Sequence, residues 1–461
     1  MISAANDVIW TYILVALLIG LGVYFTVRTR FVQFRYFGDA VRLLGAGTAS
    51  GGGISSFGAF AVGTAARVGT GNLAGVALAI AVGGPGAVFW MWVIALIGAA
   101  SAFVESTLAQ VYKVRDGDTF RGGPAYYMEK ALGQRWMGVL FAVLITFTFG
   151  LVFSSVQANT ISLAFEEAYG INRLLVGVLL AGMAGLVIFG GIKRIARVAE
   201  VLVVVMAIPY VLMALYVVAM NLSDVPRVLA LIVGDAFGIG PALGGGFGAA
   251  LMQGVRRGLF SNEAGMGSAP NAAATADVSH PAKQGLVQSL GVFIDTLVIC
   301  SATAFVILFS GVYESGQADG IVLTQQALGT QIGGWSVNFI SFAVFMFAFS
   351  SIIANYYYGE TNIEFITGDD RYLLPYRIAV LALVLFGSVA ALELVWALAD
   401  LFMGSMALVN LIAIALLSPL AFAVLRDYSR QRDAGNDPTF EAKNVPGVKN
   451  TEVWGDSRRV R

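Results

Sequence analysis

Two ten-residue phrases in this chain, residues 67–76 and 257–266, share four residue types in register. Both phrases interrupt long apolar stretches with glycine and polar side chains. Glycine-interrupted apolar segments at matching places in two halves of a chain are the sequence feature that best indicates a transporter's binding site. The shared positions are Arg67 and Arg257, Asn72 and Asn262, Ala74 and Ala264, and Gly75 and Gly265.

The chemistry expected of the first phrase is that of a helix broken inside a membrane. An unwound stretch frees backbone amides and carbonyls, which a bilayer tolerates only where they line a polar cavity. Half-helix N-termini suit a carboxylate, whereas carbonyls at a C-terminal end suit Na⁺ or an ammonium group. We expect the break at residues 68–72, whose glycines let a ligand approach the main chain. The amides of Gly71, Asn72 and Leu73 would bind a carboxylate, and Thr70 and Asn72 would add side-chain oxygens to a cation site.

The second break is expected near residues 253–258. Gln253 and Ser261 are candidate substrate contacts there, because they are polar residues within an apolar span. Phe260 can cap the pocket, although an aromatic ring at this place also suits plain packing. Gln157, in an earlier apolar segment, is a further candidate contact, with hydrogen bonding between helices as the alternative.

Charged side chains inside apolar spans are costly, so each needs a role or a partner. Arg67 cannot be neutralised and must reach water or a carboxylate, for which Glu105 and Glu263 are the expected partners. These residues would form either an inner gate that breaks when the cytoplasmic side opens, or a permanent structural ion pair. The other charges of this kind are Asp295 and Asp400, with Arg256 and Arg257 assigned to the inner half of their span.

The composition is that of a membrane protein. Hydrophobic residues make up 58% of the 461 and charged residues 12%, whereas soluble domains carry about 25% charged residues; the mean hydropathy is +0.79. The formal net charge is zero, which gives no indication of nucleic-acid binding. The only cysteine, Cys300, excludes an internal disulfide and suits a buried thiol. The only histidine, His280, is expected to be solvated in a loop, and no catalytic cluster indicates an enzyme.

Eleven apolar segments can cross a bilayer, which takes about 20 residues of helix. They lack the ten-residue alternation of barrel strands, so the predicted fold class is an all-α polytopic membrane protein with eleven transmembrane helices. The segments are residues 8–27, 54–82, 86–112, 136–165, 174–191, 196–220, 241–270, 285–310, 336–357, 373–390 and 394–424.

The distribution of Lys and Arg predicts the orientation. Most of the 28 basic residues fall in alternate connections and in the segment after the last span. The positive-inside rule then places the N-terminus outside and the C-terminus in the cytoplasm. The residues before Trp10 carry no Lys or Arg, so they lack the basic region of a secretory signal.

Eleven spans divide into one extra helix and two units of five, and the second unit is inverted relative to the first. Each unit begins with a broken helix, at 54–82 and at 241–270. A 5+5 inverted repeat with broken first helices is the LeuT-type architecture. The predicted parts are an extra N-terminal helix and cytoplasmic loop at 1–53, the two repeats at 54–220 and 241–424, and a flexible cytoplasmic tail at 427–461.

The repeat also predicts a cation site. In a LeuT-type arrangement, the third helix of the second unit lies beside the first broken helix. The paired hydroxyls of Ser350 and Ser351, with the carbonyls of residues 67–70, would form an oxygen-only cage for a hard monovalent ion. The alternative is that the hydroxyls bond to carbonyls of the preceding turn. The predicted Na⁺ ligands are Gly69, Thr70, Asn72, Ser350 and Ser351.

The chain resembles the alanine or glycine:cation symporter family, the sodium:alanine symporters, at residues 67–77, 122–128, 257–270 and 357–360. With the eleven spans, the resemblance covers about residues 8–425. It implies a LeuT-type fold and uptake of alanine or glycine, coupled to Na⁺ and sometimes to H⁺, across the bacterial or archaeal inner membrane. The family often has threonines where this chain has the paired serines, and serine keeps the oxygen ligands.

The sequence thus predicts a secondary active symporter, not an enzyme, that imports alanine- or glycine-type amino acids with Na⁺ by alternating access. No cofactor is expected beyond Na⁺ as coupling ion, and the expected partners are the amino acid and the lipid bilayer, with a monomeric protein. One alternative is H⁺ coupling through Glu105 or Asp295. Another is a ligand-gated ion channel, which would pass ion current without stoichiometric substrate movement.

Overall fold

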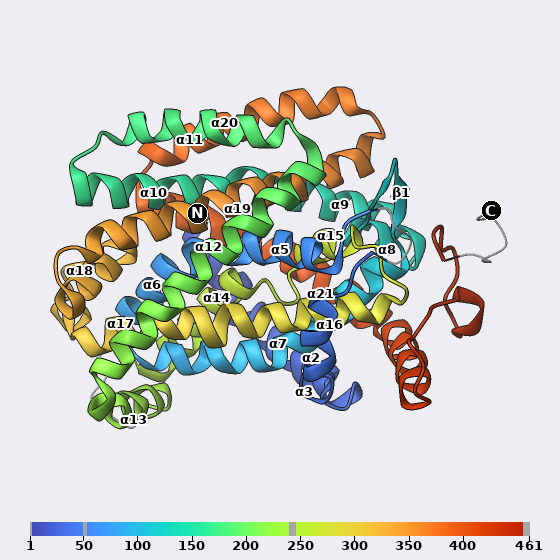
Figure 1. The fold of residues 1–461 in the computed structure, drawn as a ribbon, viewed down its shortest axis with the longest axis horizontal. Helices are drawn as coiled ribbons and strands as arrows, with labels where there is room; N and C mark the ends of the chain where they lie inside the picture. The colour runs from blue at the N-terminus through green and yellow to red at the C-terminus, as the bar shows by residue number, and fades with distance from the viewer. Residues whose placement is uncertain (1, 49–52, 239–245, 455–461) are drawn as a thin grey trace.

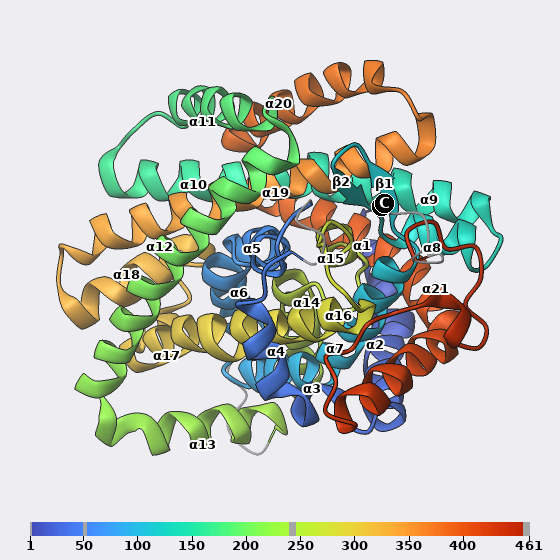
Figure 2. The same ribbon diagram turned by 45° about the vertical axis from the view of Figure 1, so that its right-hand side comes forward.

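The computed structural model describes residues 2–48, 53–238 and 246–454. This part of the chain is almost entirely helical, and its one sheet is a hairpin of β1 (Val114–Asp116) and β2 (Thr119–Arg121). Figures 1 and 2 show a layered molecule, in which broken helices lie between an upper layer with α10, α11, α19 and α20 and a lower layer with α7 and α16.

Seven helical runs of the described residues are long and apolar enough to cross a membrane, and a bent pair of helices makes up to eight. Each of the eleven predicted segments holds helix, but several form shorter helices, so the count of eleven spans stays a prediction. The seven runs are Ala4–Arg28 (α1 Ile2–Asp7, η1 Val8–Leu14, α2 Val15–Arg28), α7 Gly86–Val111, Arg135–Tyr169 (α9 Arg135–Ile145, η3 Thr146–Phe153, α10 Ser154–Tyr169), α12 Gly191–Met220, Pro281–Ser310 (α16 Pro281–Val292, η5 Phe293–Cys300, α17 Ser301–Ser310), α19 Ser336–Thr367 and α21 Leu392–Asp433.

The remaining helices are shorter. α11 (Arg173–Ile188) and α20 (Leu373–Val389) are apolar and pack side by side. The connection between the predicted spans 285–310 and 336–357 contains α18 (Gly320–Ile332), a helix that the sequence analysis did not anticipate. The other short elements are α3 Val32–Arg35, α4 Phe37–Leu44, α8 Pro124–Lys130, η4 Leu222–Asp224, α13 Val225–Ala236, η6 Val312–Ser315, α18 Gly320–Ile332, η7 Asp370–Tyr372 and η8 Ala442–Asn444.

The first broken helix lies where the sequence predicts it. α5 (Ser56–Arg67) is followed by the π-helical turn η2 (Gly71–Gly75) and α6 (Val76–Gly83), and the two halves are bent by 47°. Residues 68–70 between them fall within the predicted interruption at 68–72, whose last two residues belong to η2. Because π-helical turns are rare and gather at functional sites, this segment is the first candidate for a binding position.

The second broken helix is interrupted later than predicted. α14 (Gly246–Asn262) is continuous through residues 253–258, so the prediction of a break there is wrong. Gly254 and Gly258 serve packing instead, because a Cβ on either would lie within 2.6 Å of α7 atoms. The break is at 263–268, before α15 (Ala269–Ala274), where Glu263 has a φ of 58°.

The two broken helices run in opposite directions through the centre of the molecule (Figures 1 and 2). α14 packs against α6, α15 packs against α5, and a β-bridge joins Ile54 to Ala276 at one end. The start of the first broken helix therefore meets the end of the second. This antiparallel pairing of matching segments is what an inverted repeat requires.

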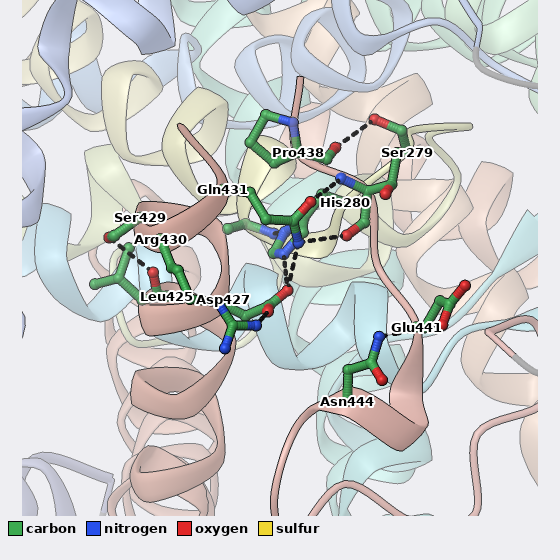
Figure 3. A network of polar contacts seen from close by, with 12 residues as sticks. Ser279, His280, Leu425, Asp427, Ser429, Arg430, Gln431, Pro438, Glu441 and Asn444 are labelled. Atoms are coloured by element: carbon green, nitrogen blue, oxygen red, sulfur yellow. Dashed lines mark hydrogen bonds and ion pairs between the residues drawn. The ribbon is translucent and has the colours of Figure 1, made fainter. Parts of the chain in front are cut away.

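The C-terminal segment after α21 packs against the body, as Figure 3 shows in part. The Phe440 amide donates to the Ser279 carbonyl at 2.9 Å, and the Trp454 indole donates to the Gln110 carbonyl at 2.7 Å. The prediction of a flexible tail does not describe residues 427–454. The tail is polar overall, but its few apolar side chains are buried on the body, including Phe440, Val445 and Val448.

His280 is buried rather than solvated, contrary to the sequence expectation. Its ring lies between the rings of Tyr428 and Phe440, and its Nε2 is 3.3 Å from the carboxylate of Asp427 (Figure 3). Burial lowers the pKa of His280 from its ordinary 6.5, opposed by the Asp427 carboxylate. A neutral histidine therefore belongs to the docked form of the tail.

Candidate substrate and cation site

Side chains hold the first break open where helical hydrogen bonds would otherwise form. Val68 leaves the helical conformation, with φ −78° and ψ 85°. The Gly69 amide then donates to Asn72 Oδ1 at 2.9 Å, and the Thr70 amide donates to Gln157 Oε1 at 3.0 Å. Gln157 reaches this point from α10, so the structure brings this candidate contact to the break through a hydrogen bond between two helices.

The glycines of the break allow neighbouring helices to approach the main chain. A Cβ on Gly69 would lie 2.3 Å from Ser351 Oγ and 2.9 Å from Gln157 Oε1. A Cβ on Gly71 would lie 3.0 Å from the Phe260 ring and 3.1 Å from the Ser261 Cα. The structure thus brings the predicted residues of four helices, α5–α6, α10, α14 and α19, to one place.

Asp295 is a buried hub beside the break. Its carboxylate accepts hydrogen bonds from Asn72 Nδ2 at 2.6 Å, Ser261 Oγ at 2.9 Å and Thr296 Oγ1 at 2.8 Å. Sequence reasoning considered Asp295 only as a proton carrier, and the signal that marks it as a site residue is a lone carboxylate in an apolar run. Asp295 lies in the π-helical turn η5, and its partner Asn72 lies in the π-helical turn η2.

The paired hydroxyls of α19 face α5, the first half of the first broken helix. Ser351 Oγ lies 2.8 Å from the Ala65 carbonyl and 3.2 Å from the Ala66 carbonyl, and Ser350 Oγ lies 3.4 Å from the Ala65 carbonyl. These are carbonyls at the C-terminal end of α5, just before the 67–70 stretch that was expected. Both hydroxyls also bond to the Phe347 carbonyl of their own helix, the alternative considered from the sequence.

An aromatic layer and an ion pair lie beside the break on the side of the molecule that carries the N-terminus. The centroid of the Phe260 ring lies 4.6 Å from that of Phe153 and 4.7 Å from that of Trp396, with the rings tilted relative to one another. Next to it, Arg257 is paired with Asp400 at 2.5 Å and lies over the Trp396 ring. Sequence reasoning missed Phe153 and Trp396, because aromatic residues are common in membrane helices.

The two arginines of α14 belong to the N-terminal side rather than the inner half. Arg256 lies 3.4 Å from Asp400 and over the ring of Trp10, near the start of the chain. The sequence analysis places the N-terminus outside and these two arginines in the inner half of their span, and the contact of Arg256 with Trp10 does not agree with both assignments.

Two predicted side chains lie differently from expectation. Gln253 packs beside Gly83, at the end of α6 that lies away from both breaks. A Cβ on Gly83 would lie 2.8 Å from the Cβ of Gln253. The Thr70 hydroxyl is buried without a hydrogen-bond partner among the described residues, while its amide binds Gln157. From α18, Thr324 donates to the Leu73 carbonyl at 3.1 Å and thereby ties the unpredicted helix to the break.

The predicted gate residues meet at the second break without forming an ion pair. Glu105 accepts from the Gly265 amide at 3.1 Å and from Asn410 Nδ2 at 2.8 Å, so it satisfies backbone freed by the break. Glu263 accepts from the Ser268 hydroxyl. Arg67 Nη1 donates to the Gln288 carbonyl at 3.3 Å, and within the described ranges no carboxylate oxygen lies within 4.0 Å of it.

Comparison with known proteins agrees with this geometry. The sequence model of the Sodium:alanine symporter family matches residues 1–442. The chain is 57% identical to the amino-acid carrier protein AlsT of Bacillus subtilis (strain 168), over 100% of this chain and 98% of that protein. It is also 57% identical to the probable sodium/glutamine symporter GlnT of the same organism, over 98% of this chain and 95% of that protein. Among solved structures, MhsT in complex with L-phenylalanine has a similar fold, with a TM-score of 0.57 at 16% identity over 79% of this chain and 89% of that one.

Proposed function

The chain belongs to the sodium:alanine symporter family, and from this premise we propose that it imports small neutral amino acids, alanine and glycine foremost, with Na⁺ by alternating access. Its LeuT-type fold provides the two broken helices that such transport uses. The observation that carries the proposal is the meeting of both broken helices with Gln157, Asp295 and Ser351 at one buried place.

The substrate position that we propose lies at the start of η2. A carboxylate there faces the N-terminal end of the second half-helix, where backbone amides and the helix dipole favour negative charge. Gly71 leaves the space, and Phe260 limits it from α14. Because the proposed position is bounded by the Phe260 ring and by backbone, we expect small side chains to fit and bulky ones to clash.

The cation position that we propose lies between α5 and α19. The carbonyls of Ala65 and Ala66 and the hydroxyl of Ser351 supply oxygen atoms within hydrogen-bonding distance of one another. Oxygen-only ligand sets suit hard monovalent cations. The lack of a Cβ on Gly69 lets Ser351 lie against the main chain here, and Thr70 and Asn72 join the cation position to the substrate position along the same short segment.

We also propose the N-terminus outside, the C-terminus in the cytoplasm, and a monomer in the cell membrane. The basic residues near the docked tail, such as Lys113, Lys130 and Lys283, gather on one side of the molecule and support this orientation.

Glutamine is a second candidate substrate. The support is specific, since a relative at 57% identity is named a probable sodium/glutamine symporter. H⁺ coupling through Asp295 is the alternative for the driving ion, because that carboxylate lies buried against Asn72 and Ser261.

Uptake of radiolabelled alanine into proteoliposomes tests the proposal. The vesicles receive an inward Na⁺ gradient, an equal K⁺ gradient or a pH gradient, with glycine and glutamine as competitors. We expect uptake only with Na⁺ and competition by glycine. Uptake driven only by the pH gradient would move the coupling to Asp295, stronger competition by glutamine than by glycine would change the substrate, and no uptake under any gradient would contradict the proposal.

A further inference from the structure

The guanidinium group of Arg67 is buried, and among the described residues only one of its three nitrogen atoms has a hydrogen-bond partner. Its residue is 1% exposed, and Nη1 alone donates a hydrogen bond, to the Gln288 carbonyl of α16. Nε and Nη2 have no hydrogen-bond partner in the part of the chain that the structure describes. These two nitrogens form one edge of the guanidinium plane, the edge that binds a carboxylate through two parallel hydrogen bonds.

Such an open edge is costly in a membrane protein. A buried charge without a paired group is strongly unfavourable, and it persists where function requires it. Glu263 and Glu105 are near enough for their charges to interact with Arg67, yet their oxygens bind Ser268, Gly265 and Asn410 instead. In this conformation the described residues therefore supply no carboxylate to the open edge.

Other unpartnered polar groups lie on the same side of the first break. Both side-chain polar atoms of Asn355 and the hydroxyl of Tyr358 are fully buried and lack hydrogen-bond partners among the described residues. They lie on α19 one and two turns beyond Ser351, the residue that contacts the C-terminal end of α5. Because Ser351 contacts the carbonyls of Ala65 and Ala66, which directly precede Arg67, these unpartnered groups of α19 begin one turn from the end of α5 that carries Arg67.

We propose that these side chains form a second, transient binding position for the amino acid. It lies between the proposed central site and the side of the molecule against which the C-terminal segment after α21 packs. The α-carboxylate of the substrate binds the Nε and Nη2 edge of Arg67, and its ammonium group binds the carboxylate of Glu263. Asn355 and Tyr358 supply hydrogen bonds to the same ligand. The inference rests on the proposed function. It adds a second binding position on the path by which the amino acid leaves the central site.

The test compares the two faces of the transporter in Arg67→Lys. Lysine keeps the charge and loses the two-nitrogen edge. We expect the external KM for alanine uptake to stay within about threefold, as for a change outside the outer binding position. The internal KM, measured by efflux from preloaded proteoliposomes, should rise about tenfold or more, because charge-assisted bonds to the carboxylate are lost.

Arg173→Lys is the matched control. Arg173 also lies in an apolar helix, but its Nε and Nη2 donate to the carbonyls of Ser388 and Ala390, so its guanidinium edge is filled by backbone. Both KM values should remain near those of the unmodified protein. As a second readout, propionate inside the vesicles should slow alanine efflux in the unmodified protein and lose this effect in Arg67→Lys.

An unchanged internal KM in Arg67→Lys would overturn the proposal. Equal losses at both faces would also overturn it, because Arg67 would then belong to the central site or to the fold. Failure of the proposed function is distinct, since the unmodified protein would then show no Na⁺-driven uptake before any variant is made.

Discussion

Replacing Gly71 by alanine tests the close approach of the two broken helices most sharply. The added Cβ would lie 3.0 Å from Phe260 Cδ1 and 3.1 Å from the Ser261 Cα. One of these contacts is to backbone, which cannot rotate away. Overpacking of this kind costs about 1–3 kcal/mol, equivalent to about 5- to 150-fold in binding affinity if the strain falls on the liganded state.

Gly75→Ala is the control within the same π-helical turn. Its Cβ would meet Trp396 at 3.7 Å and the Thr70 carbonyl at 3.8 Å, which are ordinary van der Waals distances. Both substitutions favour helix formation by similar amounts, about 1 kcal/mol, so a difference between them reports the clash rather than backbone propensity.

Equilibrium binding of labelled alanine to the purified protein in Na⁺ is the assay, with size-exclusion chromatography to confirm folding. We expect Gly71→Ala to bind at least about fivefold more weakly than Gly75→Ala. Equal affinities for the two folded variants would refute the assignment of the ligand space to the η2 start.

Three further outcomes are expected. Ser351→Ala should raise the Na⁺ concentration for half-maximal uptake more than Ser350→Ala does, because Ser351 has the shorter contacts to α5 carbonyls; an unchanged Na⁺ requirement in Ser351→Ala would remove the cation position from α19. Asp400→Asn should lower thermal stability by about 3–5 kcal/mol because it leaves Arg257 buried without its charge partner, and an unchanged melting temperature would contradict that role. Burial lowers the folded pKa of His280 below its ordinary 6.5, so tail docking should hold above about pH 6.5 and weaken as pH falls below it; proteolysis of the tail would follow this profile, and His280→Gln should abolish the pH dependence.

The first break could be predicted from sequence because its residues have little other use in a membrane helix. Gly69, Thr70, Gly71 and Asn72 combine backbone freedom with polar side chains inside an apolar span. The same logic failed at 253–258, where Gly254 and Gly258 allow α14 to pack closely on α7. Glycine permits both outcomes, and only the neighbouring helix decides between them.

The sequence analysis could not predict which side chains bond to residues far away in the sequence. Asp295 bonds to Asn72, which is 223 positions away, and Arg257 pairs with Asp400 rather than with an acid of its own broken helix. The tail was judged from its own polar composition, whereas its apolar residues are buried against loops far back in the chain. Contacts of this kind follow from how the repeats pack, which composition and spacing do not encode.

Parallel measurement of ²²Na⁺ and tritiated alanine entry into the same proteoliposomes tests the central claim most directly. A symporter moves the two in a fixed ratio, and each flux should vanish when the other solute is withheld. Na⁺ entry that continues without alanine, or alanine entry that continues without Na⁺, would contradict Na⁺-coupled symport by this protein.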